Sequence, residues 1–406
     1  SESAIPSKTW CSYPWVHSYQ GSRYERKLCC ISDDIEGHDK LSTEEFWNSP
    51  YMQDTRKKMM SGEQVDVCKS CYKNEGNGIR SLREESNRDV TSVEDPHKAI
   101  EDILGGCTTE NGFNENQPNY FDYRTIHCNL QCISCGDVYS STWMKLNKEM
   151  YGWEPNFTPD PIYEKHMADE MIKSLNNNIL NNIYWAGGEP MMSNLHWSVI
   201  DRMVEMLDEP SNITYVKDIK MHYNTNLTRL KWKGKSIPQM LEPFQPSIQA
   251  SLDGTHETLE YTRDGAKWED VESNWKEYHK YLNKGKQMGV ATVLSAPVLF
   301  DIDRYLEFYG EYDPFLHPHY FYVKLDHIDT NPGLLDLRRY PKDIFYSTIN
   351  NVKQKMKSSG LRGSKKWDQI LTAYEKEYED LDNSEYVISK LKLKQTHREK
   401  FCVTNR

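Results

Sequence analysis

The sequence reads FDYRTIHCNLQCISC at residues 121–135. Its first part, Phe121–Ile126, is rich in aromatic and β-branched residues and predicts a strand. The loop that follows carries three cysteines, at Cys128, Cys132 and Cys135. Thiolates with this C-x3-C-x2-C spacing can bind one four-iron cluster and leave one iron without a protein ligand. The alternative is a zinc site with a remote fourth ligand such as His127, although structural zinc sites more often present paired C-x2-C hooks.

Strands and helices alternate on the C-terminal side of this motif. The strand candidates, in order, are Phe121–Ile126, Asn182–Ala186, Val216–Tyr223, Ser247–Leu252, Val290–Leu294 and Tyr320–Leu325. Apolar residues recur at helical spacing between most of them, notably in Trp268–Leu282 and Ile302–Tyr309. Because parallel strands need crossover helices, six such βα units indicate an α/β fold with a curved or closed parallel sheet. Functional residues of such sheets gather at the C-terminal ends of the strands.

The residues on either side of the βα region have a different composition. Residues 1–117 are rich in turn formers, charges and cysteines, and Ser86–Glu101 resembles a charged connector. We expect a metal to take the place of a hydrophobic core in this segment. After about residue 333 the chain is charged and helical, with predicted helices at Lys365–Asp380 and Glu385–Lys394. The predicted domains are therefore 1–117, 118–332 and 333–406.

The charge balance argues against nucleic acid as a partner. The 406 residues include 50 Lys and Arg against 61 Asp and Glu, a net charge of −11. Proteins that bind phosphate backbones are usually basic. The longest uncharged apolar run, Gly289–Phe300, is shorter than the ~18 residues needed to cross a bilayer. Because Ser1–Lys8 also lacks the pattern of a secretory signal, we expect a soluble, cytoplasmic protein that does not enter a membrane.

The cysteines are clustered rather than evenly spread. Nine of the ten lie between Cys11 and Cys135, and Cys402 stands alone. In a reducing compartment such a cluster usually binds metal rather than forming disulfides. Cys107 and Cys402 are predicted to be inert. A loop rather than a metal site is expected around a loose group of histidines and prolines, namely Pro314, His317, Pro318, His319 and His327.

The C-x3-C-x2-C loop resembles the defining motif of the radical S-adenosylmethionine (SAM) superfamily, which follows the first strand of its barrel. A second motif supports the resemblance, because Gly187-Gly188-Glu189-Pro190 ends the next strand as the GGE(P) motif does there. Two glycines let the backbone approach a ligand closely, and a carboxylate can accept hydrogen bonds from an ammonium group. Over residues 118–330 the resemblance implies a partial (β/α)6 TIM-like barrel.

Later strand ends continue the resemblance. Tyr223-Asn224-Thr225-Asn226 stands where members often read T-N-G, and residues 249–254 resemble their S-(I/L/V)-D-G segment. An ordinary strand end or a surface charge is the alternative for each. Ser134 departs from the aromatic residue that often precedes the third cysteine, so no adenine contact is assigned there. The SAM-binding residues implied by the resemblance are Gly187, Gly188, Glu189, Asn224, Ser251 and Arg263.

The N-terminal cysteines resemble a SPASM/twitch module, which holds an auxiliary iron–sulfur cluster. The match consists of Cys11-Ser12-Tyr13-Pro14-Trp15, Gly21, Cys29-Cys30 and Cys68-Lys69-Ser70-Cys71. In most enzymes of this type the module follows the barrel, so its position here is a permutation. The resemblance implies a second [4Fe-4S] cluster on Cys11, Cys29, Cys68 and Cys71, with Cys30 as the alternative to Cys29. A zinc ribbon on the same four thiols is the other interpretation.

The resemblance also implies a reaction. SAM binds the open iron of the Cys128/Cys132/Cys135 cluster and is cleaved to methionine and a 5′-deoxyadenosyl radical, which abstracts a hydrogen atom from the substrate. A peptide or protein substrate is favoured, and a small molecule such as a sugar alcohol is the alternative. The auxiliary cluster transfers electrons, and flavodoxin or ferredoxin serves as reductant. A zinc-stabilised binding protein and an iron–sulfur electron carrier are the alternatives from other classes. The sequence assigns no catalytic residue.

Overall fold

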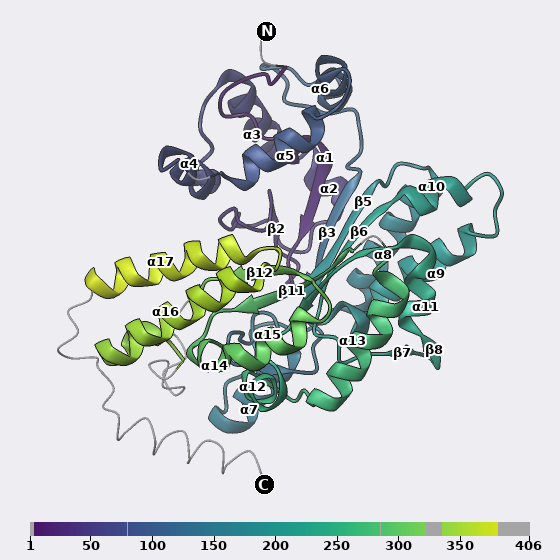
Figure 1. Cartoon of the computed structure of the whole chain (residues 1–406). Helices are drawn as coiled ribbons and strands as arrows, with labels where there is room; N and C mark the ends of the chain where they lie inside the picture. Colours follow the sequence, from purple (N-terminus) through teal and green to yellow (C-terminus); the bar gives the residue numbers. More distant parts are fainter. Residues whose placement is uncertain (1–3, 79, 285, 322–334, 381–406) are drawn as a thin grey trace. The chain divides into compact units, whose positions relative to one another are not determined.

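The computed structural model describes residues 4–78, 80–284, 286–321 and 335–380 (Figure 1). The chain forms two compact units. Unit 1 comprises Ser1–Asn129, Asp137–Asn224 and Met240–Pro246, and unit 2 comprises Leu130–Gly136, Thr225–Gln239 and Ser247–Arg406. The cysteine-rich N-terminal residues thus share a unit with the first βα segments. Domain boundaries near residues 117 and 332 stay predictions.

Unit 1 contains five strands of sheet among its described residues, in the order β6-β5-β3-β1-β2. Their bounds are β1 (His17–Gln20), β2 (Arg26–Lys27), β3 (Tyr120–Thr125), β5 (Asn182–Gly187) and β6 (Lys220–Thr225). All neighbours pair in parallel except β2, which is antiparallel to β1. The strands predicted at Phe121–Ile126 and Asn182–Ala186 are confirmed. The strand predicted at Val216–Tyr223 begins too early, because residues 213–218 form a helix and β6 starts after it.

Unit 2 contains three parallel strands among its described residues, in the order β12-β11-β9. Their bounds are β9 (Ser247–Ser251), β11 (Met288–Val293) and β12 (Phe315–His319). Two antiparallel pairs accompany them, β4 (Gln131–Cys132) with β10 (Arg263–Asp264) and β7 (Lys231–Trp232) with β8 (Lys235–Ser236). The strands predicted at Ser247–Leu252 and Val290–Leu294 are confirmed.

The last described strand lies earlier than the sequence predicts, and the predicted histidine loop is wrong. The strand lies at β12, before the predicted Tyr320–Leu325, and it contains His317 and His319. Each residue of β12 pairs with β11, and Pro318 stands opposite Thr292. An edge strand can carry a proline, because the missing N–H is not needed on its open side. Residues 322–325 and His327 lie outside the described residues.

Helices separate most of the parallel strands, which confirms a mixed α/β fold consistent with a partial TIM-like barrel. The helices of unit 1 are α1 (Tyr13–Val16), α2 (Thr43–Trp47), α3 (Pro50–Ser61), α4 (Lys69–Gly76), α5 (Leu82–Thr91), α6 (Pro96–Leu104), α7 (Ser141–Tyr151), α8 (Pro161–Asn176), α9 (Asn194–Met206) and α10 (Ile213–Asp218). Those of unit 2 are α12 (His256–Thr262), α13 (Trp268–Leu282), α14 (Ala296–Phe300), α15 (Ile302–Gly310), α16 (Lys342–Ser359) and α17 (Ser364–Asp380), while α11 (Ile237–Leu241) has residues in both.

Residues 335–380 include the helix predicted at Lys365–Asp380, which is α17 and packs against α16. The helix predicted at Glu385–Lys394 lies outside the described residues. None of the described helices has both the length and the apolar character needed to span a bilayer.

The central strands of unit 1 have two unlike faces, because successive side chains of a strand point in opposite directions. One face is buried and mostly aromatic or aliphatic, with Phe121, Tyr123, Ile183, Trp185, Met221 and Tyr223. The other carries Asp122, Arg124, Tyr184, His222 and Asn224. Parallel sheets usually bury apolar side chains on both faces. The polar face is therefore where binding residues are expected.

The residues before β3 have a hydrophobic core of their own. It includes Trp10, Trp15, Phe46, Met52 and Met59, all nearly or fully buried. The buried Arg56 guanidinium donates hydrogen bonds to the carbonyl oxygens of Pro14 (2.8 Å) and Trp47 (2.7 Å). The expectation that a metal replaces the core of this segment is therefore wrong. Any metal there adds to a core that the side chains already form.

Strand β1 joins the cysteine-rich residues to the βα strands of unit 1. It pairs in parallel with β3, so that His17 stands opposite Tyr120 and Tyr19 opposite Asp122. The imidazole Nε2 of His17 lies 3.5 Å from Asp122 Oδ2, and Arg124 Nε donates to Asp122 Oδ1 at 2.8 Å. Burial alone would raise the pKa of Asp122, but Arg124 and His17 together outweigh burial and hold that pKa below its ordinary value.

Candidate functional site

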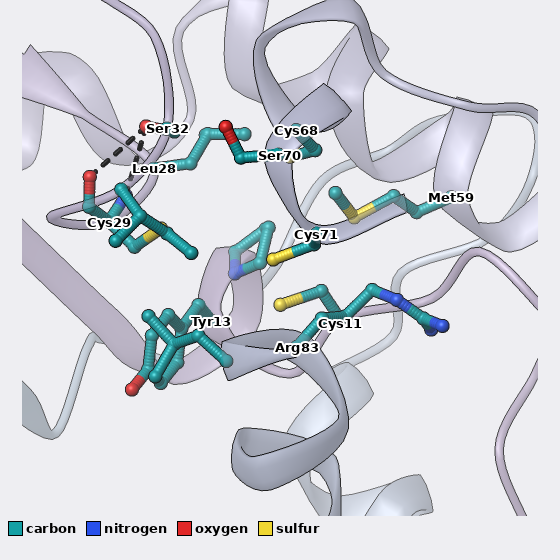
Figure 2. Close-up of a pocket in the computed structure, with 13 residues that line it drawn as sticks. Cys11, Tyr13, Leu28, Cys29, Ser32, Met59, Cys68, Ser70, Cys71 and Arg83 are labelled. Atoms are coloured by element: carbon teal, nitrogen blue, oxygen red, sulfur yellow. Dashed lines mark hydrogen bonds between the residues drawn. The ribbon is translucent and has the colours of Figure 1, made fainter. Parts of the chain in front are cut away.

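Four N-terminal cysteines line one pocket in unit 1, and they are Cys11, Cys29, Cys68 and Cys71 (Figure 2). Figure 2 shows the sulfur atoms of Cys11 and Cys71 pointing in the same direction. Most other lining residues are apolar, including Leu28, Met59 and Leu82, and Arg83 is the charged residue among them. The pocket therefore combines soft sulfur donors, an apolar wall and a positive charge.

Local structure explains how these thiols reach the pocket. Cys68 is the last residue of a 3-10 turn and precedes α4, and Cys71 lies in the first turn of that helix. Residues three apart lie on the same face of a helix, so both sulfurs can face one side. Cys29 is buried and lines the pocket, whereas its neighbour Cys30 is exposed and does not.

Three of the pocket cysteines have raised pKa values. Burial raises the pKa of Cys11 to about 11, and it also raises the pKa of Cys29 and of Cys68. The Arg83 charge acts in the opposite direction on Cys11 and Cys68, but with a smaller effect. At neutral pH these side chains are thiols, so a metal that binds them must displace protons.

The sulfurs of the pocket are not gathered around a single point. Within residues 4–78, 80–284, 286–321 and 335–380, no group of three or more His, Cys, Asp or Glu side chains is arranged to hold one metal ion. A zinc ion needs its thiolates about 2.3 Å from one centre. An iron–sulfur cluster places several metal atoms between its ligands, so its cysteines stand further apart.

The C-x3-C-x2-C loop contributes cysteines to both units. In unit 1, the Cys128 N–H donates to Ser141 Oγ at 3.2 Å, and Thr142 Oγ1 donates to the Cys128 carbonyl at 2.5 Å. These contacts attach the start of the loop to the first turn of α7. In unit 2, the Cys135 N–H donates to the Cys132 carbonyl at 3.1 Å. Cys132 and Cys135 therefore lie on one tight turn.

The Gly187-Gly188-Glu189 segment packs directly on the residues that precede Cys128. The Gly188 N–H donates to the Thr125 carbonyl at 2.6 Å, and the Glu189 N–H donates to the His127 carbonyl at 2.7 Å. A Cβ added at Gly187 would lie 2.5 Å from Thr125 O, and one added at Gly188 would lie 2.3 Å from His127 O. Both glycines therefore allow the end of β5 to approach another backbone segment closely, and their predicted role in SAM binding stays a prediction.

The side chain of Glu189 is fully buried behind this contact. Its Oε1 accepts the N–H of Met191 at 3.0 Å, so the carboxylate caps the 3-10 turn at Pro190–Met192. Asn224 lies near the C-terminal end of β6 in the same unit and is half-buried. In unit 2, Ser251 is the last residue of β9 and is also half-buried. Each of these side chains stands at the strand end where the sequence predicts it.

Arg263 makes polar contacts with two predicted site segments of unit 2. Its Nη2 lies 2.9 Å from Asp253 Oδ2, and its Nη1 donates to Cys132 Sγ at 3.5 Å. Pairing of β10 with β4 places Arg263 directly opposite Cys132. Asp253 is itself buried, and its Oδ1 accepts the Val293 N–H at 2.7 Å. A positive charge is thereby fixed beside one of the predicted cluster ligands.

Two residues that sequence reasoning missed support the start of the cysteine loop. Glu164 on α8 is buried, and its Oε1 lies 3.2 Å from His127 Nε2. The hydroxyl of Tyr24 donates to the same Oε1 at 2.8 Å. These contacts direct Nε2 of His127 toward α8. The zinc interpretation would then use the other ring nitrogen, Nδ1, as the metal ligand. No local sequence signal indicates the contacts, because their partners are far apart along the chain.

The two cysteines predicted to be inert have different outcomes. Cys107 is buried in the N-terminal core and does not line the four-cysteine pocket. Its environment agrees with that of an inert thiol, and its role stays a prediction. Cys402 lies outside the described residues.

No family model and no curated protein matches the sequence. Similar solved structures include native anSMEcpe with bound AdoMet, an anaerobic sulfatase-maturating enzyme, at 17% identity over 50% of this chain and 52% of that chain, with a TM-score of 0.36. SuiB of Streptococcus suis bound to S-adenosylmethionine is 13% identical over 75% of this chain and 64% of its own, with a TM-score of 0.39. Both are SPASM/twitch radical SAM enzymes. The match spans less than two thirds of either neighbour's length.

Proposed function

We propose that this protein is a radical SAM enzyme, which cleaves SAM reductively and uses the 5′-deoxyadenosyl radical to abstract a hydrogen atom from its substrate. The packing of Gly188 and Glu189 against the residues before Cys128 carries this proposal. Backbone hydrogen bonds of 2.6 and 2.7 Å bring the end of β5 to the start of the cysteine loop. If Glu189 and the cluster held by Cys128 bind the same SAM molecule, these two residues must lie close together.

The ligands that we assign to the SAM-binding [4Fe-4S] cluster are Cys128, Cys132 and Cys135. When bound, this cluster supplies one electron and an open iron for SAM. The guanidinium of Arg263 donates to Cys132 Sγ at 3.5 Å, and a nearby positive charge favours the thiolate form of a cysteine. Asp253 holds this guanidinium in place through an ion pair of 2.9 Å.

The SAM contacts that we assign come from strand ends. Glu189 uses Oε1 to accept the Met191 N–H, and a carboxylate has about four acceptor positions, so it can also accept from the methionyl ammonium of SAM. Arg263 has five N–H donors and can bind the SAM carboxylate as well as Asp253. Asn224 and Ser251 provide polar groups at the ends of β6 and β9. Gly187 and Gly188 keep β5 close to the cysteine loop.

We assign an auxiliary [4Fe-4S] cluster to Cys11, Cys29, Cys68 and Cys71. The thiol donors, the apolar lining and the Arg83 charge suit an anionic cluster. Cys29 rather than Cys30 is the proposed ligand, because it lines the pocket. Four cysteines leave no iron open to a substrate, so electron transfer is the function proposed for this site. A zinc ribbon on the same four thiols is the alternative.

The substrate class that we propose is a peptide or protein. The neighbours anSMEcpe and SuiB have both been solved with a peptide, named Cp18Cys and SuiA respectively. The polar face of β3, β5 and β6 carries Asp122, Arg124 and Tyr184 and offers hydrogen-bonding groups for a polar substrate. A small molecule such as a sugar alcohol is the alternative substrate. The proposed reductant is flavodoxin or ferredoxin.

The deciding experiment is anaerobic purification followed by iron, sulfide and zinc analysis and a SAM cleavage assay with dithionite. Two [4Fe-4S] clusters predict about eight irons per chain together with 5′-deoxyadenosine as product. About four irons with cleavage would remove the auxiliary cluster from the proposal and leave the rest intact. Zinc without iron and no cleavage would refute the proposal and favour a zinc-stabilised binding protein.

A further inference from the structure

Helix α5 holds the backbone on both sides of Cys11. The amide Nδ2 of Asn87 donates to the Trp10 carbonyl at 2.8 Å, and its Oδ1 accepts the Ser12 N–H at 2.8 Å. Asn87 is only 3% exposed. One side chain therefore fixes both peptide groups that flank the Cys11 residue.

Arg83, one turn earlier on the same helix, strengthens this attachment. Its Nη1 donates to the Trp10 carbonyl at 2.7 Å. Its Nε and Nη2 bind the two carboxylate oxygens of Glu75 at 2.9 and 2.6 Å, and this fork fixes the guanidinium. Because Arg83 also lines the four-cysteine pocket, the same residue links the Cys11 backbone to the pocket wall.

Ser86, also on α5, reaches the sulfur of Cys11 itself. Its Oγ lies 3.7 Å from Cys11 Sγ, and it donates to the Arg83 carbonyl at 2.9 Å. While Cys11 is a thiol, its S–H can donate to this oxygen. A thiolate ligand has no proton and can only accept, so the Ser86 hydroxyl must then turn its hydrogen toward the sulfur. The hydroxyl is buried, and water does not compete for this bond.

We propose that α5 is the positioning element of the auxiliary cluster, in which Asn87 sets the place of Cys11 and the Ser86 hydroxyl donates a hydrogen bond to its sulfur. This inference rests on the proposed auxiliary cluster. A donor to a ligand sulfur stabilises the more negative, reduced state and raises the reduction potential. Ser86 thus tunes how readily the site accepts an electron, and Asn87 determines how firmly the cluster is held.

The first test is the reduction potential of the auxiliary cluster. We would use the full chain with Cys128, Cys132 and Cys135 all changed to Ala, so that about four irons of auxiliary origin give the EPR signal. In this background Ser86→Ala should keep its iron and shift the potential to a more negative value. Ser86→Thr keeps the hydroxyl and should restore the original potential. Ser92→Ala, at the exposed C-terminal end of α5, is the matched control and should cause no shift.

The second test is the rate at which a chelator removes iron from the same protein. Loss of a residue that orients a metal ligand typically weakens a site about 10- to 100-fold, so Asn87→Ala should release iron at least about tenfold faster. Asn77→Ala, at the exposed end of α4, is its control.

The possible failures can be told apart. If the parent protein binds no auxiliary iron, the auxiliary cluster of the proposed function is refuted and this inference with it. If the parent binds it but Ser86→Ala leaves the potential unchanged, the role of Ser86 is refuted while the proposed function stands. An unchanged rate of iron release in Asn87→Ala would refute the role of Asn87 in the same way.

Discussion

The four-cysteine pocket and the C-x3-C-x2-C loop present their sulfurs in different ways. In the pocket, Cys11, Cys29 and Cys71 are buried and Cys68 is half-buried, and the proposed ligand set is drawn from distant parts of the chain. In the loop, Cys132 is buried, Cys128 and Cys135 are half-buried, and all three lie on one short segment. Ligands from distant segments can surround a metal, whereas ligands on one loop approach it from one side. This difference agrees with the electron-transfer role proposed for the pocket and the SAM-binding role proposed for the loop.

The largest effect is expected at the C-x3-C-x2-C loop. Cys132→Ala should reduce the formation of 5′-deoxyadenosine to background, because the cluster loses one of its three ligands. Chromatography of the products after addition of dithionite and SAM measures this loss. Cys107→Ala is the control, since this buried cysteine belongs to neither set. Cleavage that survives in Cys132→Ala would show that the loop is not the SAM site.

Loss of ligands from the four-cysteine pocket should have the opposite effect on SAM cleavage. Cys68→Ala/Cys71→Ala should lose about four irons per chain but still cleave SAM in the absence of substrate. The separate N-terminal core should keep the variant folded. Iron analysis and the cleavage assay on one preparation test both statements. An iron content equal to that of the unmodified protein would contradict the assignment of the pocket.

One added methyl group can break the contact between the Gly187-Gly188-Glu189 segment and the residues that precede Cys128. In Gly188→Ala the added Cβ would lie 2.3 Å from the backbone oxygen of His127. We expect a loss of about 1–3 kcal/mol in the free energy of unfolding and weaker SAM cleavage. Denaturant unfolding followed by circular dichroism measures the first effect.

Gly310→Ala is the matched control, because a Cβ at that helical position meets no atom within 4 Å. It should change stability by no more than about 1 kcal/mol, in the stabilising direction. Equal stability of the two variants would mean that the close approach at Gly188 is not a constraint.

The smallest effect concerns pH and the junction between β1 and β3. Burial raises the pKa of Asp122, but Arg124 and His17 together hold it below the ordinary value of 3.8. The Asp122 carboxylate therefore stabilises the folded state fully above that value. This contribution is lost as the pH falls through the lower, folded-state pKa. Asp122→Asn should be less stable at neutral pH and should lose less further stability between about pH 5 and pH 2.

Urea unfolding at several pH values tests this expectation, with the exposed Asp201→Asn as control. A parent protein and an Asp122→Asn variant that lose stability in parallel on acidification would contradict it.

The sequence predicts the strands that are buried and that follow a regular pattern. Phe121–Ile126 and Asn182–Ala186 show this, and each is close to the observed strand. β12 cannot be predicted from the sequence, because Pro318 suggests a loop and only pairing with β11 makes the segment a strand. The composition of Ser86–Glu101 suggests a connector, yet Ser81 and Glu84 form the capping box that begins α5. That S-x-x-E signal is present in the sequence.

The candidate site is only partly visible in the sequence. Cysteines that share a loop can be grouped by spacing, and the pocket cysteines are grouped by a family resemblance. The contact of Arg263 with Cys132 spans 131 positions, and that of Asn87 with Trp10 spans 77. Contacts of this range depend on how whole strands and helices pack. Spacing alone therefore identifies the predicted ligands but not the residues that orient them.

The parallel pairing of β1 with β3 also sets an order for biosynthesis. His17 has its partner at Tyr120, about a hundred positions later in the chain. While the protein is being made, the N-terminal segment must wait several seconds, at roughly 5–20 residues per second, before this strand can pair. During that interval β1 can pair only with β2. The N-terminal core, whose residues all precede β3, can form before the pairing with β3 is possible.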